Sequence, residues 1–196
     1  MTAAAELFDQ REQPARNLAE QAAAVAVACH QMALRFHRGG RLIVFGIGSA
    51  STDAQHVAVE FVHPVIVGKK ALPAISLTTD VATVTGIAAT CGMSAIFSHQ
   101  LRYLGSPADI ALGISTDGNC DSIVSGLRTA HELGMLTIAL AGCDVGAIAR
   151  CPVDHVLVTR SPDPRVVKEL QVTAYHVLWE LVHVFLEQPG VLEVVA

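Results

Sequence analysis

The sequence is poor in charged residues and contains no long, uninterrupted apolar segment. Of its 196 residues, 16% are charged and 52% are hydrophobic, which is a high apolar content for a soluble monomer. The apolar stretches are too short and too interrupted to span a bilayer, which requires about 20 apolar residues in a row. The apolar excess therefore predicts strands that are buried on both faces, together with subunit interfaces that cover further surface.

Basic clusters are also missing. The formal net charge is −5, and no basic run is longer than Lys69-Lys70. Because binding to a nucleic-acid backbone requires a concentrated basic patch, we expect no direct nucleic-acid partner. The N-terminal segment MTAAAELFDQRE carries acidic residues where a secretion signal would carry a basic segment and an apolar core. We therefore expect a cytoplasmic protein that does not associate with membranes.

Paired cysteines are absent as well. The five cysteines are odd in number and form no CxxC pair: Cys29, Cys91, Cys120, Cys143 and Cys151. This pattern predicts reduced, mostly buried thiols rather than disulfides or a cysteine metal site.

Short β-rich runs separated by helical patterns make up most of the chain. Five runs lack strict polar alternation, as strands covered on both faces should: 41–46, 71–77, 108–115, 135–142 and 154–159. Helical patterns lie between or after them, at about 52–63, 80–90, 93–103, 121–133 and 144–150. This alternation predicts an α/β fold with a doubly wound, five-stranded parallel sheet and right-handed crossovers.

Helices are expected at both ends of the chain. A broad apolar stripe predicts a helix over 15–38, with Pro14 near its start and Gly39-Gly40 at its end, and a shorter helix is expected at 3–12. A final long helix is expected over 163–187. No linker or low-complexity tract divides the chain. We therefore expect one domain over 1–196, with an N-terminal helical arm (1–40), an α/β core (41–160) and a C-terminal helix and tail (161–196).

Two strand-to-helix turns are rich in Gly, Ser and Thr. The run LIVF leads into GIGSASTD, and IALG leads into ISTDGNCD. In open α/β sheets, ligands bind at such carboxyl ends of strands, where loop amides and helix N-termini favour anions. Neither turn has the GxxxxGK[ST] pattern of a P-loop, and the first lacks the third glycine of the dinucleotide fingerprint. The turns therefore predict an anion site other than these two nucleotide sites.

Four segments in this order resemble a known family: GIGSASTDAQHVAVEF (46–61), LPAISLTTD (72–80), ALGISTDGNC (111–120) and ELGMLTIALAG (132–142). They resemble the sugar isomerase (SIS) domain, specifically its phosphoheptose isomerase branch, over nearly the whole chain. The resemblance implies a five-stranded parallel sheet, a homotetramer with active sites at subunit interfaces, a zinc ion, and isomerisation of a sugar phosphate such as sedoheptulose 7-phosphate. The branch also contains a bacterial protein that binds a replication initiator and is not known as an enzyme.

Residue positions follow from the resemblance. His56, Glu60 and His176 match zinc ligands of the family, and Glu60 and His176 are the candidate proton-transfer residues. The candidate residues for binding the sugar phosphate are Ser49, Ser51, Asp53, Thr79, Asp80, Ser115, Thr116, Asp117 and Asn119.

Asp117 departs from the family's phosphate loop. It replaces a phosphate-binding serine, as Cys120 does, and Ala50 replaces the serine of the first loop. An ionised carboxylate about 4 Å from a phosphate would cost roughly 4 kcal/mol per phosphate charge at an effective dielectric near 20. Three placements are open. Asp117 caps the following helix and fills the anion slot itself, it turns outward or pairs with Lys69 or Lys70 of another subunit, or it contacts an uncharged or cationic ligand.

Lys168 departs from the family's metal site. It stands eight residues before His176, where the family has a glutamine ligand. An ammonium group has no lone pair and cannot ligate a metal, so zinc remains possible but in doubt at this site. Alternatively, the Lys168 ammonium occupies the place of the metal and pairs with Glu60.

Two classes of function follow. The first is a phosphoheptose isomerase-like aldose–ketose isomerase that acts by proton transfer through Glu60 and His176. The second is a non-catalytic protein on the same scaffold, which binds a sugar derivative or a protein partner through a remodelled pocket. We expect a homo-oligomer, and more precisely a tetramer, in either case.

Overall fold

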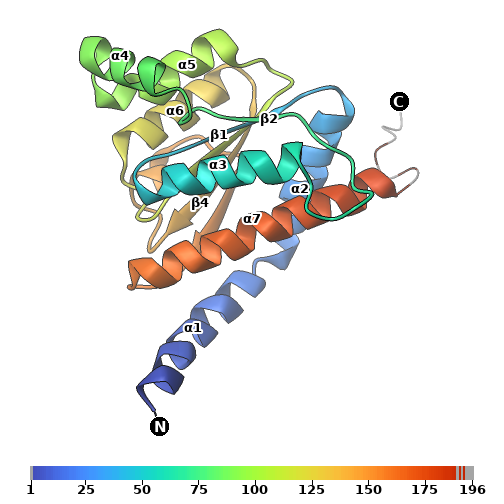
Figure 1. The fold of residues 1–196 in the computed structure, drawn as a ribbon, viewed down its shortest axis with the longest axis vertical. Coiled ribbons are helices and arrows are strands. Elements are labelled where there is room, and N and C mark those ends of the chain that lie inside the picture. Colours follow the sequence, from blue (N-terminus) through green and yellow to red (C-terminus); the bar gives the residue numbers. More distant parts are fainter. Residues whose placement is uncertain (1, 189, 191, 193–196) are drawn as a thin grey trace.

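Five parallel strands form the central sheet of the computed structural model, which describes residues 2–188, 190 and 192 (Figure 1). The strand order is β2-β1-β3-β4-β5. The strands are β1 (Leu42–Gly46), β2 (Ala74–Ser76), β3 (Ile110–Ser115), β4 (Leu136–Gly142) and β5 (His155–Thr159). The expected α/β fold with a doubly wound, five-stranded parallel sheet is confirmed.

Both faces of the sheet are buried. Successive side chains of a strand point to opposite faces, and each face packs in a hydrophobic cluster of its own. Leu42 and Val44 of β1 belong to one hydrophobic cluster, and Ile43 and Phe45 belong to a second one. The first cluster is completed by α2 (Ala22–His37), α3 (Ser49–Val62) and α7 (Pro164–Glu187). The second is completed mainly by α4 (Val81–Cys91), α5 (Ile96–Leu104) and α6 (Asp121–Glu132). Burial on both faces explains the unbroken apolar runs of the strands.

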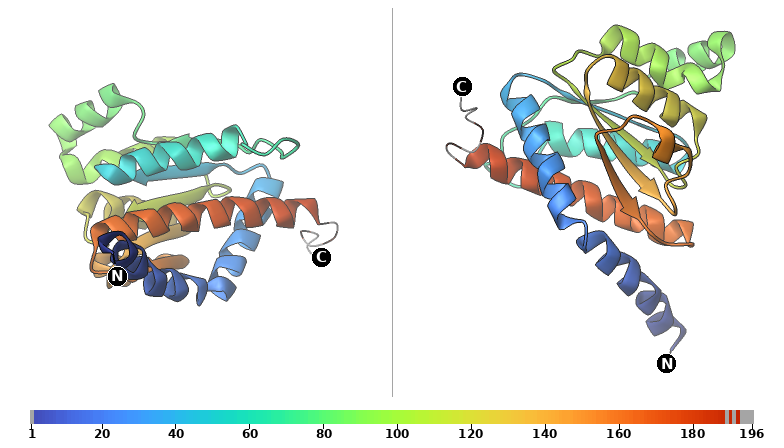
Figure 2. Two further views of the ribbon diagram at one scale, coloured as in Figure 1. Left: turned by 60° about the horizontal axis from the view of Figure 1, so that its bottom comes forward. Right: turned by 180° about the vertical axis from the view of Figure 1, so that it is seen from behind.

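The N-terminal arm differs in detail from its expected form. Helix α1 covers Ala3–Ala19, so Pro14 lies inside it, and the break falls at Glu20 and Gln21 instead of near residue 13. Helix α1 has no buried residue, and Figures 1 and 2 show it projecting from the body of the molecule. The boundary placed at Pro14 is wrong, because we expected this proline near the start of the second helix, whereas it lies inside the first helix in the structure.

Other elements are shorter than expected. The run at 71–77 contributes only three residues to the sheet as the edge strand β2, and 144–150 contains only a 3-10 turn, η2 (Gly146–Arg150). A second 3-10 turn, η1 (Met93–Ala95), precedes α5. All five cysteines have free thiols, and only Cys29 is buried, so the expectation of mostly buried thiols is wrong. Among the described residues, no helix is long and apolar enough to cross a membrane.

The strand order makes the connections that leave β1 and β3 diverge. The chain turns outward in opposite directions from these neighbouring strands, which defines the switch point where ligands bind in such sheets. Gly46 at the end of β1 pairs with Ile114 of β3, so the loops after the two strands start side by side. These are the two Gly- and Ser-containing turns that the sequence singled out.

Candidate active site

Helices α3 and α7 lie side by side on one face of the sheet (Figures 1 and 2). Helix α3 starts directly after Gly48, whose φ of 61° turns the chain from β1 into the helix. The two helices are joined by the indole of Trp179, which donates a hydrogen bond to the backbone oxygen of Glu60 at 2.9 Å. This buried contact fixes Glu60 relative to α7.

The three expected zinc-ligand positions come together between these helices. The ligand atoms of His56, Glu60 and His176 all lie within 4.8 Å of one another. His56 and Glu60 are one turn apart on α3, with 3.2 Å between Nε2 and Oε1, and the rings of His56 and His176 are 5.2 Å apart. We call these three residues the triad.

The hydrogen bond of His176 determines which of its ring nitrogens faces the triad. Nδ1 is 2.9 Å from the backbone oxygen of Val172, and a carbonyl can only accept. In neutral His176 the proton is therefore on Nδ1, and Nε2 carries a free lone pair. A lone pair at this nitrogen can ligate a metal or accept a proton.

Glu60 contributes an unsatisfied oxygen to the triad. Its side chain is buried, and Oε2 is one of two buried side-chain atoms without a hydrogen-bond partner within the described part of the chain. A buried carboxylate oxygen without a partner carries a desolvation cost that a cation or a proton would relieve. Two imidazoles and a carboxylate are also ligands that zinc prefers, so the residues of the triad fit this metal.

Tyr175 is a member of this site that the sequence analysis missed. Its hydroxyl lies 2.7 Å from Nδ1 of His56, and the side chain is buried. Burial raises the pKa of the Tyr175 hydroxyl, and the negative charges of Asp53 and Glu60 raise it further. The hydroxyl is therefore protonated at neutral pH. Nothing in the spacing of the sequence indicates this contact, which depends on how α7 packs on α3.

Lys168 does not pair with Glu60, contrary to one of our two hypotheses. Its ammonium group lies 2.6 Å from Oδ2 of Asp53 and 3.0 Å from the backbone oxygen of Ser49. Both partners belong to the first turns of α3, whereas Glu60 lies farther along the same helix. The ammonium group therefore does not neutralise Glu60, and the buried carboxylate of Asp53 is already paired.

The second loop, 115–120, is held by its own side chains. Oδ1 of Asp117 accepts a hydrogen bond from the Asn119 amide at 2.9 Å and lies 3.4 Å from the Ser115 hydroxyl. The Ser115 hydroxyl in turn accepts from the Gly118 amide at 2.9 Å. Asp117 is exposed and does not cap α6, whose N-cap residue, Cys120, makes no side-chain cap bond. Part of the loop's capacity to bind an anion is thus used by Asp117.

The segment 143–147 clamps this loop from the other side. The side-chain oxygen of Asn119 accepts from the Ala147 amide at 3.1 Å, and its Nδ2 donates to the Asp117 carbonyl at 3.1 Å. Val145 adopts a φ of 72°, which is strained for a β-branched residue. Asn119, expected to bind substrate, therefore shapes the loop.

Replacing Gly118 by alanine is expected to open this clamp. Gly118 has a φ of +71°, and an added Cβ would lie 1.9 Å from the Val145 carbonyl oxygen. Gly39 is a matched control, because its φ is +85° and nothing lies within 4 Å of an added Cβ. Chemical denaturation should show Gly118→Ala to be less stable than Gly39→Ala by about 1–3 kcal/mol. Equal losses in the two variants would show that the close approach to Val145 is unimportant.

The first loop also bonds mainly to itself. The Ser51 hydroxyl donates to the Gly48 carbonyl at 2.7 Å, and the Ser49 carbonyl accepts from Thr52 and Lys168. Beside it lies a cavity of about 200 Å³, lined in part by Gly48, Ser51 and Thr78. Ser49 is the first residue of α3, and Thr116 directly follows β3.

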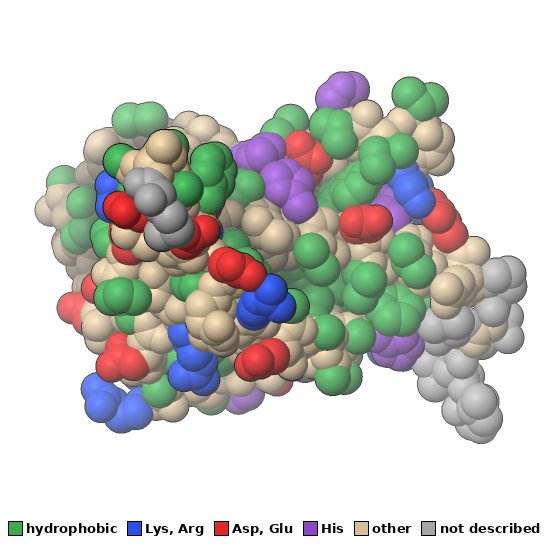
Figure 3. Space-filling model, turned by 90° about the horizontal axis from the view of Figure 1, so that it is seen from below, with side chains coloured by type: hydrophobic (Ala, Val, Ile, Leu, Met, Phe, Trp, Pro, Cys, Tyr) green, Lys and Arg blue, Asp and Glu red, His purple; other side chains and the backbone are tan. Residues whose placement is uncertain are grey.

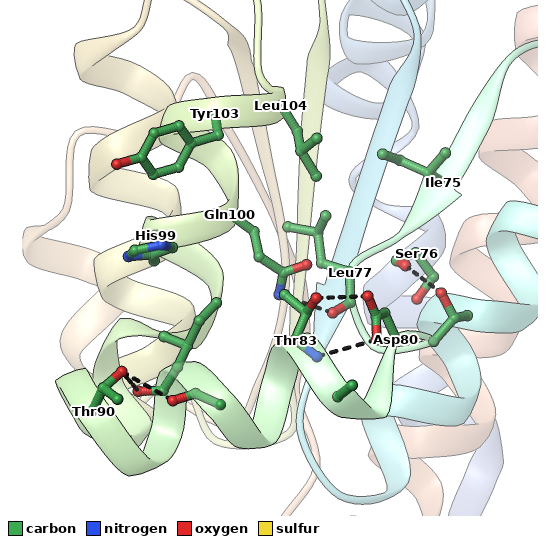
Figure 4. A pocket seen from close by; sticks show the side chains of 14 residues that line it. Ile75, Ser76, Leu77, Asp80, Thr83, Thr90, His99, Gln100, Tyr103 and Leu104 are labelled. Atoms are coloured by element: carbon green, nitrogen blue, oxygen red, sulfur yellow. Dashed lines mark hydrogen bonds between the residues drawn. The ribbon is translucent and has the colours of Figure 1, made fainter.

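Thr79 and Asp80, which were expected to bind substrate, lie away from the triad. They line a groove of about 710 Å³ between β2, α4 and α5, and no triad residue contributes to this groove (Figure 4). Asp80 caps α4 by accepting from the amide and hydroxyl of Thr83, which lowers the pKa of its carboxyl. The Thr79 hydroxyl donates to the Ser76 carbonyl at 3.0 Å. In this structure their side chains serve local structure.

Comparison with known proteins gives the same family as these motifs. A model of the SIS domain matches residues 8–142. The phosphoheptose isomerase of Desulfovibrio desulfuricans is 38% identical over 169 residues, which are 86% of this chain and 80% of that protein. The structure of a phosphoheptose isomerase from Francisella tularensis superimposes with a TM-score of 0.86 at 32% identity, covering 93% of this chain and 99% of that one. The phosphoheptose isomerase of Neisseria gonorrhoeae gives a TM-score of 0.84 at 28% identity, with 91% and 96% covered. The chain belongs to the SIS domain family and, within it, to the phosphoheptose isomerases.

Proposed function

We propose that this protein is an aldose–ketose isomerase of sugar phosphates, with sedoheptulose 7-phosphate or a related sugar phosphate as substrate. The observation that carries the proposal is the triad, in which a buried carboxylate with an unsatisfied oxygen lies beside an imidazole whose free nitrogen can accept a proton. The names of the relatives, which are phosphoheptose isomerases, support the same reaction.

The reaction requires one proton to move between neighbouring carbon atoms. The carboxylate of Glu60 removes the proton from the carbon next to the carbonyl group and leaves an enediolate. The proton lost from one carbon is balanced by one gained at its neighbour, and His176 is the candidate for this second transfer while its Nε2 is not ligating a metal, since its one lone pair cannot do both. The reaction changes neither the number of atoms nor the oxidation state of the molecule as a whole.

We propose that zinc is held by His56, Glu60 and His176. The support is the set of two imidazoles and one carboxylate, the unsatisfied Glu60 oxygen, and the pairing of Lys168 with Asp53, which leaves the triad free of an ammonium group. When bound, zinc polarises the carbonyl group of a substrate as a Lewis acid. With three protein ligands, the site is of the open kind that catalytic zinc uses.

We propose that the single domain over 1–196 assembles as a homotetramer in the cytoplasm. Large hydrophobic side chains stand exposed in the single chain, among them Phe8 (75% exposed) and Tyr103 (79% exposed). An apolar groove of about 410 Å³ also lies between the N-terminal arm and α7. Hydrophobic side chains reach the surface at many points of the face drawn in Figure 3. Subunit interfaces would cover such surface.

A second function is favoured by Asp117. Because its carboxylate uses the Asn119 amide, the loop offers an incoming phosphate fewer donors and a negative charge. A non-catalytic protein that binds a sugar derivative or a protein partner would tolerate this change. The proton-transfer residues of the triad have no evident purpose in such a protein, so we rank the isomerase first.

Exchange of carbon-bound hydrogen with solvent separates the two functions. The purified protein, either loaded with zinc or treated with a chelator, is incubated in D2O with sedoheptulose 7-phosphate, and the sugar is followed by NMR. An isomerase should incorporate deuterium next to the carbonyl group and form an aldose phosphate. Binding without deuterium incorporation in both preparations would refute the isomerase and support the non-catalytic function.

A further inference from the structure

The two histidines of the triad are held in different ways. The Nδ1 atom of His176 bonds to a backbone carbonyl, which can only accept and therefore allows a single neutral tautomer. The Nδ1 atom of His56 instead bonds to the hydroxyl of Tyr175 at 2.7 Å, and a hydroxyl can donate or accept. His56 can therefore keep this hydrogen bond in either tautomer.

The tautomer of His56 depends on the partner of its other ring nitrogen, Nε2. Nε2 lies 3.2 Å from Oε1 of Glu60. A carboxylate only accepts, so in neutral His56 this arrangement places the proton on Nε2, and Nδ1 accepts from the Tyr175 hydroxyl. For Nε2 to ligate a metal, its proton must be absent, and neutral His56 then carries its proton on Nδ1. Nδ1 in that tautomer donates to the oxygen of Tyr175.

Tyr175 is also fixed in place. It is 2% exposed within the hydrophobic cluster that packs α2, α3 and α7 on the sheet. Its ring meets the ring of His56 edge-on at 5.5 Å and lies 4.8 Å from the ring of His176. Because the ring is buried and contacts both histidines, it holds the hydroxyl at Nδ1 of His56.

We propose that Tyr175 is a positioning residue whose hydroxyl serves both tautomers of His56, so that Nε2 of His56 can pass from its hydrogen bond with Glu60 to a bound zinc ion. This inference rests on the zinc site that is part of the proposed function. The partner of a ligating histidine commonly affects metal affinity by about 10- to 100-fold. Tyr175 therefore acts on the metal through His56 and does not contact the metal itself.

The test uses Tyr175→Phe, which removes the hydroxyl and keeps the ring. Zinc affinity, measured by competition with a chromophoric chelator, should fall by about 10- to 100-fold. The matched control is Tyr103→Phe, since Tyr103 is the only other tyrosine and is 79% exposed on α5. The control should bind zinc as the unmodified protein does. Thermal unfolding of the zinc-free variants establishes that both are folded.

The tautomer of His56 provides a second measurement that a merely structural role would not move. Long-range ¹H–¹⁵N spectra of histidine-labelled protein should show the His56 proton on Nε2 without zinc and on Nδ1 with zinc. In Tyr175→Phe, the Nδ1 signal of His56 should shift in the zinc-free protein, whereas the His176 tautomer should not change.

Three results would overturn the proposal: an unmodified protein that binds no zinc, a Tyr175→Phe variant that binds zinc as tightly as the unmodified protein, or His56 signals that are the same in both. Failure of the proposed isomerase is a separate outcome. In that case the zinc affinities and the His56 tautomers follow the proposal, while sedoheptulose 7-phosphate incorporates no deuterium.

Discussion

Glu60→Gln is expected to lower kcat for isomerisation by about 10²- to 10⁴-fold, the range that a positioned proton-transfer group contributes. Glutamine keeps the shape of the side chain and an oxygen that can ligate, but it cannot take a proton from carbon. The effect should appear both in aldose–ketose conversion and in deuterium incorporation from D2O, because both need the same proton abstraction. The metal content of the variant is measured in parallel, since Glu60 is also a candidate ligand.

Glu180→Gln is the matched control for this change. Glu180 is an exposed glutamate on α7, outside the triad, and the same substitution there should leave kcat unchanged. A Glu60→Gln variant that retains normal deuterium exchange at full zinc occupancy would show that another group removes the proton. His176, the other candidate proton-transfer residue, would then be the first residue to examine.

The layered fold could be predicted because it follows from the chemistry of whole segments. Five apolar runs separated by helical patterns leave few arrangements other than a parallel sheet covered on both faces. The errors fall at the boundaries of helices, because single residues decide where a helix begins and ends. Pro14 is tolerated inside α1, a helix without buried residues, so a local rule about proline misplaced the break between the first two helices.

The candidate site could be predicted only in part. The spacing of His56 and Glu60 by four residues places them on one face of a helix, and the family resemblance added His176. The partners of these residues could not be predicted, because they depend on how α7 is rotated against α3. Tyr175 and Lys168 reach α3 from different turns of α7 and meet different residues, His56 and Asp53, and no spacing in the sequence encodes either pairing.

The loops show a second limit of prediction from the sequence, which concerns hydrogen bonds of the backbone. The sequence correctly marked 115–120 as unusual for an anion site, because an aspartate stands where the family has serine. It could not show that Asp117 bonds back to the amide of Asn119, or that the segment 143–147 clamps the loop through the Asn119 side chain. Such contacts arise between segments about 28 residues apart and depend on backbone angles such as the φ of 72° at Val145.

Asp117→Ser is expected to raise the affinity for sugar phosphate by roughly 100-fold at low salt. At about 6 Å and an effective dielectric near 40, a carboxylate repels each phosphate charge by about 1.4 kcal/mol, or nearly 3 kcal/mol for a dianion. The substitution also releases the Asn119 amide and the Ser115 hydroxyl, which Asp117 now engages. Each freed donor adds about 0.5–1.5 kcal/mol if it bonds to the phosphate.

Calorimetric titration with sedoheptulose 7-phosphate and with the unphosphorylated sugar measures this effect. Only the phosphate should gain affinity, and the gain should shrink as salt screens the exposed carboxylate of the unmodified protein. Asp144→Ser is the control, because it removes an exposed carboxylate from the neighbouring segment and should change the affinity little. Equal gains in affinity in both variants would show that the effect comes from the net charge of the protein and not from the position of Asp117. An unchanged affinity in Asp117→Ser would mean that phosphate binds away from this loop, and the donors would have to be sought beside Ser49 and Ser51 in the first loop.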